Sequence, residues 1–226
     1  MTFRIRLHLD PRLYVRDPEE TELGRRIVDA SIRGIDEYGF EKFTFRKLAE
    51  SIGSTEASVY RYFRNKHRLL LYLVSWYWNW VAYRMAFQAP STDDPKERLS
   101  KIVEVLLEST VYDPTWSHID EVALHRIIVV EGNKAYQTRW VDDDNAEGLF
   151  LAYKDLCTTV AEAILAVAPE YRFPHALAST LIESSHQQIF FAQHLKRLTE
   201  IRAPEGDFAE VGLFLGDLLH RVLGIE

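Results

Sequence analysis

The stretch TFRKLAESIGSTEASVYRYF, residues 44–63, decides how this chain folds. Thr44 and Thr55 are favourable N-cap residues, so each of them predicts the start of a short helix. Between the two helices, Gly53 can adopt the positive φ that a tight turn requires, and Ala49 supplies the small residue needed where helices cross. Apolar side chains expected to face inward recur at helical spacing: Leu48, Ile52, Val59 and Tyr62. The pattern predicts a helix-turn-helix, although an ordinary helical hairpin with a glycine turn shares these features.

A further helix is expected on each side of this stretch. Asp17 can cap the first one and Pro18 fits its first position, while Gly39 offers a left-handed stop. Its apolar stripe is expected to consist of Leu23, Ile27, Ala30 and Tyr38. On the other side, Asn65 is expected to cap a helix that contains residues 69–80.

The rest of the chain repeats the helical period between proline and glycine breaks. Helices are expected at about 96–110, 118–131, 144–168, 174–199 and 207–223. Residues 3–9 instead alternate apolar and polar side chains, which is a strand period, and with no second strand nearby they are expected to form an arm. The predicted fold is therefore all-α, with about nine helices: a three-helix DNA-binding domain and a larger C-terminal helical bundle. The expected divisions are an arm at 1–20, the helix-turn-helix domain at 21–71, and a larger helical domain at 72–226.

Composition and charge restrict the environment and the partners. Cys157 is the only cysteine, so no internal disulfide can form, which suits a reducing compartment. With no signal peptide and no membrane-spanning stretch in the sequence, we expect a soluble, cytoplasmic protein. Residues 1–72 carry 14 Lys/Arg and 11 Asp/Glu, whereas residues 73–226 carry 13 and 23, so a basic head precedes an acidic body. Such asymmetry indicates separate tasks for the two parts.

The head also resembles a known family. Gly39-Phe40, the run from Thr44 to Ala49, Gly53, the run from Ser58 to Phe63, and Asn65-Lys66 are similar to the TetR family of bacterial repressors. The resemblance covers roughly residues 22–72. It implies a dimeric, sequence-specific DNA-binding regulator, most often a repressor that a small-molecule ligand releases from a palindromic operator. It also implies that residues 72–226 form the ligand-sensing and dimerisation domain. In such a dimer, half-sites lie about 34–36 Å apart.

The resemblance also implies roles for individual residues. The helix from Thr55 to about Tyr62 would enter the major groove. Candidates for base contacts are Thr55, Glu56, Ala57 and Tyr60, and candidates for phosphate contacts are Thr44, Arg46, Tyr62 and Lys66. Two residues depart from the family pattern. Ser54 replaces an apolar residue in the turn, and Glu56 stands where a basic or neutral residue is usual. Glu56 can accept a hydrogen bond from a cytosine amino group, or it can simply place a favourable charge at the helix start.

Residues 72–87 form an unusually aromatic segment whose rings would point in every direction of a helix. Core packing explains this density, and an aromatic wall of a ligand pocket is the alternative. Tyr77, Trp80 and Arg84 are the pocket candidates. The rings favour a largely apolar effector, and because they attract cations, a cationic group is an open option.

The last two long helices are expected to form the homodimer interface, by the family's four-helix contact across a two-fold axis. The candidates mix apolar and small residues at helical spacing: Leu177, Leu181, Ser184, Ser185, Gln188, Leu215, Leu218, Leu219 and Val222. Burial within one subunit is the alternative reading of the same pattern.

Other function classes find less support in the sequence. His118 and His125 lie about 10 Å apart along a helix, too far to hold one ion without further ligands, and the acidic run at 142–144 reads as a solvated helix start. We therefore expect no metal site and no cofactor. The usual enzyme motifs are missing, which leaves an all-helical enzyme as a minor alternative. A protein of this fold that binds a protein partner instead of DNA is the other alternative, motivated by Glu56 and the acidic body.

Overall fold

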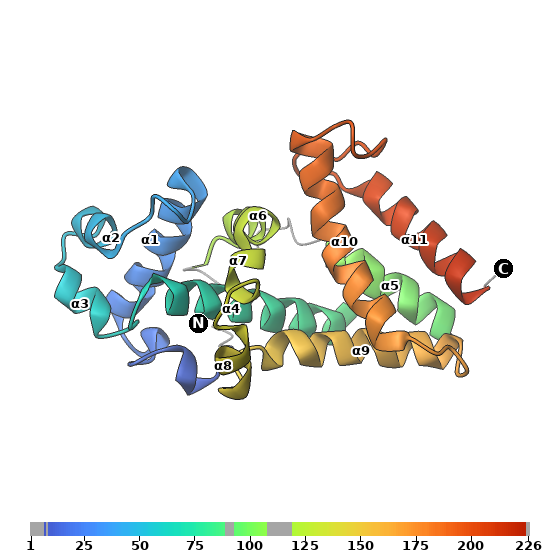
Figure 1. Ribbon diagram of the computed structural model, residues 1–226, viewed down its shortest axis with the longest axis horizontal. Helices are drawn as coiled ribbons and strands as arrows, with labels where there is room; N and C mark the ends of the chain where they lie inside the picture. The colour runs from blue at the N-terminus through green and yellow to red at the C-terminus, as the bar shows by residue number, and fades with distance from the viewer. Residues whose placement is uncertain (1–6, 8, 89–92, 108–118, 225–226) are drawn as a thin grey trace, which may run out of the picture. The chain divides into compact units, whose positions relative to one another are not determined.

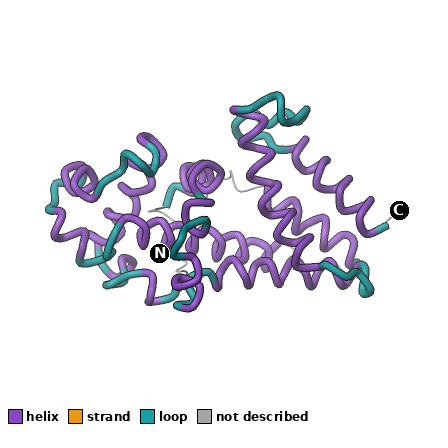
Figure 2. Tube along the Cα trace, viewed as in Figure 1, coloured by secondary structure: helices purple, strands orange, loops and turns teal. Residues whose placement is uncertain are grey.

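The computed structural model describes residue 7 and residues 9–88, 93–107 and 119–224 of the chain, and within them every regular element is a helix (Figures 1 and 2). The described elements are η1 (Pro11–Leu13), η2 (Pro18–Glu20), α1 (Glu22–Tyr38), α2 (Phe45–Ser51), α3 (Glu56–Tyr60), α4 (Lys66–Gln88), α5 (Pro95–Leu107), α6 (Glu121–Glu131), α7 (Asn133–Tyr136), α8 (Val141–Ala146), α9 (Leu151–Val167), α10 (Pro174–His194) and α11 (Ala209–Leu223). The all-α prediction is confirmed. The described part has eleven α-helices rather than about nine, because the short helices α7 and α8 precede α9.

The chain divides into two compact units. The first unit comprises residues 1–79 and 111–152, and the second comprises residues 80–110 and 153–226. Helix α4 belongs to the first unit up to Asn79 and to the second from Trp80 onward. The first unit therefore contains α6, α7 and α8 together with the predicted helix-turn-helix. The functional division at residues 20 and 71 stays a prediction, since compactness does not test which residues sense a ligand.

Helix α1 begins later than the sequence predicts. Thr21 caps it by accepting a hydrogen bond from Gly24 N at 2.9 Å, whereas Asp17 caps the 3-10 helix η2 through Glu19 N. The chain folds back at this point, and a Cβ on Gly24 would come within 2.3 Å of the Pro18 carbonyl oxygen. Such a contact excludes any other residue at Gly24 without a shift of backbone. Asp17 and Thr21 are both suitable N-cap residues. The close contact between Pro18 and Gly24 accompanies the start of α1 after Thr21.

The ends of the neighbouring helices follow the predicted signals. Gly39 ends α1 with φ 75°, and its N–H bonds to the Ile35 carbonyl. Asn65 caps α4 by accepting from Arg68 N at 2.8 Å. Tyr38, expected in the apolar stripe of α1, is instead 48% exposed and lies beneath the Lys47 ammonium. Tyr38 is the last residue of the helix, so it can turn toward solvent without leaving a gap in the core.

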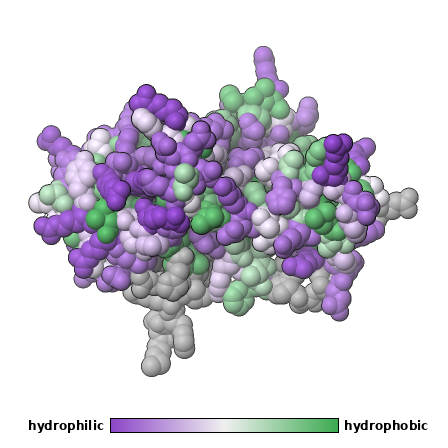
Figure 3. Space-filling view, turned by 60° about the horizontal axis from the view of Figure 1, so that its bottom comes forward, coloured by the Kyte–Doolittle hydropathy of each residue, from purple (hydrophilic) through white to green (hydrophobic). Residues whose placement is uncertain are grey.

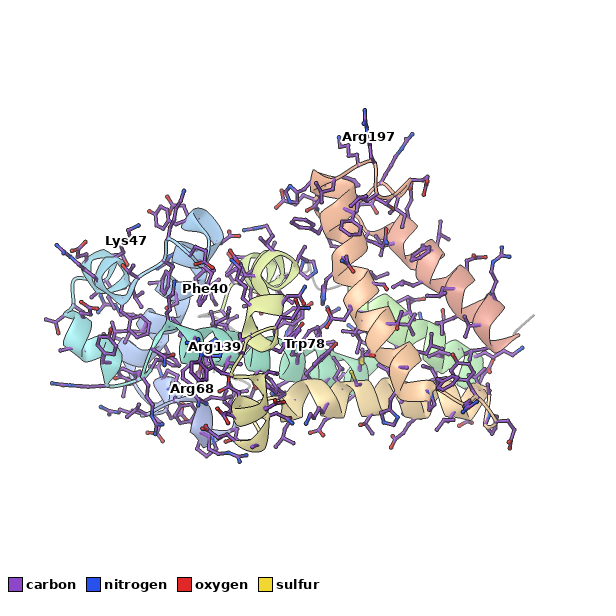
Figure 4. All side chains as sticks on the ribbon, in the orientation of Figure 1. Phe40, Lys47, Arg68, Trp78, Arg139 and Arg197 are labelled. Atoms are coloured by element: carbon purple, nitrogen blue, oxygen red, sulfur yellow. The ribbon has the colours of Figure 1, made fainter. Side chains whose placement is uncertain are left out.

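Helix α4 is buried on all sides from residue 69 to residue 78, as its ring density predicts, whereas Phe87 near its end is 68% exposed. Trp76, Tyr77, Trp78 and Trp80 are each at most 2% exposed. Trp78, which is labelled in Figure 4, is one of the buried rings of this helix. No helix within the described residues combines the length and the apolar character needed to cross a bilayer.

The second unit packs α10 against α11 and α5. Gly212 allows α11 to approach α5 closely, since a Cβ there would lie 3.1 Å from a Leu107 methyl group. Five of the predicted interface residues are buried inside this unit, at most 6% exposed: Leu177, Leu181, Ser185, Leu215 and Leu219. These five side chains are already covered within the single chain, which is the alternative reading of the sequence pattern. Of the other candidates, Ser184, Gln188 and Leu218 are partly exposed and Val222 is 40% exposed.

Candidate nucleic-acid interface

The turn between α2 and α3 has the geometry that its sequence predicts. The Thr44 hydroxyl accepts from Lys47 N at 3.3 Å and the Thr55 hydroxyl accepts from Ser58 N at 3.2 Å, so each side chain caps its helix. Gly53 has φ 62°, the left-handed conformation that favours glycine. These local interactions fix where α2 ends and where α3 begins.

The inner face of the two helices is closed. Leu48, Ala49, Ile52, Val59 and Tyr62 are all at most 8% exposed. Burial of these side chains holds the helices together, because apolar burial stabilises by about 25 cal/mol per Å². The four positions predicted to face inward are therefore buried, and so is Ala49, the small residue predicted at the crossing. The departure at Ser54 is accommodated, since its N–H bonds to the Ala49 carbonyl at 2.9 Å.

The outer face of α3 presents the four candidates for base contacts. Thr55, Glu56, Ala57 and Tyr60 are all exposed to solvent. The Tyr60 ring packs edge-on against Phe45 with 5.1 Å between ring centroids, which leaves the side chain 48% exposed. One edge of Tyr60 is thus fixed by the protein while the other can meet a ligand.

The phosphate candidates at the start of α2 are accessible. Thr44 is exposed, and Arg46 forms an ion pair with Glu50 at 3.0 Å in which the two side chains are 80% and 65% exposed. An exposed pair of this kind contributes only about 0–1 kcal/mol. A phosphate can therefore compete for Arg46 at little cost.

Tyr62 and Lys66, the other two phosphate candidates, are engaged within the protein. Tyr62 is 3% exposed, and its hydroxyl lies 2.7 Å from the Thr21 hydroxyl. The Lys66 ammonium donates to the carbonyls of Phe40 and Glu41 at 3.1 and 3.3 Å and lies 4.6 Å from the Phe40 ring centroid. Both side chains hold neighbouring segments in place, so their contact with phosphate stays a prediction.

A buried carboxylate also holds the turn between α1 and α2, and the sequence analysis does not anticipate it. Glu131, at the end of α6, is 7% exposed and accepts a hydrogen bond from Phe40 N at 2.9 Å. Its other oxygen pairs with Lys134 at 2.8 Å, and Lys134 also reaches Glu41 at 3.1 Å. This contact lowers the pKa of the Glu41 carboxyl, and the bond to Glu131 raises the pKa of the Lys134 ammonium. Phe40 itself lies in the first unit (Figure 4).

The acidic run before α9 is divided between solvent and the protein interior. Asp142 and Asp143 are exposed, as expected for a solvated helix start, but Asp144 is 5% exposed. Its carboxylate pairs with His67 at 3.0 Å and with Arg68 at 3.5 Å, both in the first turn of α4. These contacts join α8 to the beginning of α4. No local pattern signals them, because 77 residues separate His67 from Asp144.

The pocket candidates lie on both sides of the division within α4. Tyr77 is fully buried in the first unit, where its ring packs against Trp78 and lies 6.2 Å from that of His125. Trp80 and Arg84 belong to the second unit, with the Arg84 guanidinium 5.1 Å from the Trp80 ring centroid. Their role in a pocket stays a prediction.

The second unit also contains an open cleft of about 570 Å³ beside the loop after α10, from which Arg197 extends (Figure 4). Its lining residues are Ala192, Gln193, Lys196, Thr199, Glu200, Ile201, Arg202, Ala203 and Pro204. The sequence analysis does not single out this loop. Of the two histidines weighed there as metal ligands, His118 lies outside the described part of the chain, and the His125 ring lies beside that of Tyr77.

Two capped helices crossing at a small residue, with the outer face of the second exposed, define a DNA-binding protein of the helix-turn-helix class. Residues 27–73 match the family model described as bacterial regulatory proteins, tetR family. The matched segment contains the helix-turn-helix, so the head of this chain is similar in sequence to the DNA-binding domain of these transcriptional regulators. No curated protein matches the chain in sequence.

Solved structures share the fold at low sequence identity. The fatty acid degradation regulator FadR from Bacillus halodurans has a TM-score of 0.57 and 14% identity, over 88% of this chain and 93% of its own. AibR in complex with isovaleryl coenzyme A and operator DNA has a TM-score of 0.55 and 16% identity, over 88% and 98%. The ketosteroid transcriptional regulator KstR2 of Mycobacterium tuberculosis has a TM-score of 0.54 and 16% identity, over 88% and 93%. Most of the chain, and not only the matched head, therefore shares its fold with these three proteins.

Proposed function

We propose that this regulator is a homodimeric repressor that binds a palindromic operator and leaves it when a small molecule binds the helical body. The observation that carries the proposal is the firmly capped α3 with Thr55, Glu56, Ala57 and Tyr60 exposed on its outer face. Side chains on a rigid helix can meet base edges without a large cost in conformational entropy.

The N-terminal part of α3 reads base edges in the major groove in this proposal. Such contacts specify sequence, whereas contacts to phosphate fix the position of the protein on the duplex. Glu56 accepts from a cytosine amino group, which makes its base preference different from that of a basic residue. Thr44 and Arg46, at the exposed start of α2, bind phosphate, and the N–H groups of the helix N-termini add donors.

Dimer formation needs an apolar surface that the single chain leaves uncovered, and α11 provides one. Leu213 is 74% exposed and the adjacent Phe214 is 39% exposed, whereas Val222, which is 40% exposed, lies on another side of the helix near its end. Figure 3 shows a face on which hydrophilic side chains predominate, with apolar side chains in scattered patches. Exposed apolar side chains gathered on one long helix favour an interface there. Ser184, Gln188 and Leu218 would lie at its margin.

The effector in this proposal is largely apolar. In the second unit, the ring of Trp80 and the guanidinium of Arg84 would line part of its site, and Tyr77 stays a pocket candidate in the first unit. FadR is described as a regulator of fatty acid degradation and KstR2 as a ketosteroid regulator, and both compound classes are largely apolar. AibR is described in complex with isovaleryl coenzyme A, in which a small apolar acyl group is joined to a charged carrier. Ligand binding can release DNA only by favouring one spacing of the two heads over another. Because its target is chromosomal DNA, the cytoplasm is the proposed compartment.

Selection of bound duplexes from a random pool by the purified protein tests this proposal. We expect enrichment of a palindrome whose half-sites lie about 34–36 Å apart or a multiple of that distance. Failure to retain any duplex at low salt would contradict DNA binding, because the phosphate contribution is largest there. Retention of all duplexes without enrichment would contradict sequence-specific reading.

A further inference from the structure

The segment that precedes α1 is a fixed part of the unit that carries α2 and α3. Asp10 and Asp17 cap its two 3-10 helices, and Leu13 between them is 1% exposed. Val15 N donates to the Tyr62 carbonyl at 2.8 Å, which joins the segment to the residues that follow α3. Residues 10–20 are therefore held against the helix-turn-helix. Of the arm predicted at 3–9, only residues 7 and 9 belong to the described part of the chain.

Arg16, which follows Val15, lies on this fixed segment. Its guanidinium carbon is 5.8 Å from the centroid of the Tyr62 ring, and the side chain is exposed. Within the described part of the chain, no carboxylate forms an ion pair with Arg16. Arg12, on the same segment, is in contrast bound to Asp10. The structure thus positions one guanidinium beside the end of α3 and leaves its charge uncompensated.

The nearest acidic side chains on the same segment are directed to other partners. The Asp17 carboxylate accepts from Glu19 N at 2.8 Å, and the Glu19 carboxylate accepts from the Tyr72 hydroxyl at 3.3 Å. Arg61 and Arg64, which flank Tyr62 and Phe63 in the sequence, are also exposed. No ion pair involves either of them among the residues that the structure describes. The end of α3 is consequently a local concentration of positive charge.

We propose that Arg16 is a DNA-contact residue that binds a backbone phosphate beside the groove read by α3. The inference rests on the proposed function and adds a contact from outside the segment that matches the family. Three properties support it: the guanidinium fork matches the geometry of phosphate oxygens, the backbone that carries it is ordered, and the Tyr62 ring beneath it limits its freedom before DNA arrives. A phosphate contact contributes affinity and register but no base preference.

The salt dependence of DNA affinity tests this contact directly. The duplex recovered by selection is titrated with the wild-type protein and with Arg16→Gln over a range of salt concentrations. Loss of one phosphate contact should reduce the slope of log K against log salt by about 0.9, which corresponds to roughly eightfold weaker binding at 0.1 M salt. The ranking of mutated duplexes should not change. Arg16→Lys keeps the charge and should retain most of the slope.

Two further variants separate this contact from other effects. Arg172→Gln removes an equally exposed guanidinium that lies 5.0 Å from the Phe173 ring in the second unit, and it should leave the slope unchanged. Tyr62→Phe keeps the ring under Arg16 but removes the hydroxyl, so any loss of affinity should occur without a change of slope. The thermal unfolding midpoint of Arg16→Gln should equal that of the wild type, since the side chain is exposed.

Equal slopes for wild type and Arg16→Gln would overturn the inference while leaving DNA binding intact. An equal loss of slope in Arg172→Gln would also overturn it, because the effect would then be one of net charge. If the wild-type protein retains no duplex at low salt, the proposed function fails and the inference fails with it.

Discussion

At the scale of single residues, Glu56 has the sharpest expected effect on DNA recognition. It is the exposed acidic residue in the first turn of α3, and a carboxylate there repels nearby phosphates while it can accept from cytosine. Glu56→Gln should raise affinity for random duplex and reduce discrimination at one base pair by about 1–3 kcal/mol. Competition binding with single-base variants of the selected operator measures both effects. Unchanged discrimination would mean that Glu56 acts only through the charge at the helix start.

His186 gives the protein a predictable response to acid. It is 6% exposed on α10, and burial lowers its pKa to about 4 from an ordinary value of 6.5. The unfolded chain therefore binds the proton first as pH falls. The stability that neutral His186 contributes is complete above about pH 6.5 and is lost progressively toward pH 4, by about 1.4 kcal/mol per pH unit.

Urea unfolding of wild type and His186→Gln between pH 4 and pH 7 measures this contribution. The variant should show a weaker decrease in the free energy of unfolding over that range. His220→Gln, which alters an exposed histidine on α11, should follow the wild type. Parallel curves for wild type and His186→Gln would contradict the assignment.

At the scale of elements, the end of α6 holds the turn between α1 and α2. Glu131→Ala removes the acceptor of Phe40 N and leaves a buried amide unsatisfied, which should lower the free energy of unfolding by about 1–3 kcal/mol. Glu131→Gln keeps an oxygen acceptor and should restore part of this loss. Amide hydrogen exchange at Phe40 and chemical denaturation together measure the effect. Normal exchange at Phe40 in Glu131→Ala would contradict it.

The elements also show what the sequence can and cannot predict. Thr44, Gly53 and Thr55 act on residues at most three positions away, so the helix-turn-helix and its exposed face could be predicted closely. The start of α1 could not, because Asp17 and Thr21 are both suitable caps and a contact between Pro18 and Gly24 decides between them.

Contacts between residues that lie far apart in the sequence could not be predicted at all. Glu131 and Phe40 are 91 residues apart, and nothing local to either residue indicates the bond between them. The predicted interface stays a prediction for a related reason. Leu181 and Leu215 have the spacing expected of an interface, but a period of apolar residues does not say whether the cover comes from the same chain or from a partner.

At the scale of the whole molecule, the exposed face of α11 should control the oligomeric state. Leu213→Glu places a charge at a position that is 74% exposed in the single chain, so the subunit should stay folded while the dimer dissociates. Light scattering and DNA binding should both report the loss, since a monomer spans only one half-site. Leu198→Glu, at a 59% exposed position in the loop after α10, should remain dimeric. A stable dimer of Leu213→Glu would place the interface elsewhere.

The bonds that α6, α7 and α8 make to the start of the chain bear on protein engineering. A fusion protein that borrowed only residues 1–79 as a portable operator-reading module would discard Glu131, Lys134 and Asp144. The Phe40 amide, the Glu41 carboxylate and the His67 ring would then lose these hydrogen-bond partners. A chimera assembled from this regulator should therefore transplant residues 119–152 together with the head.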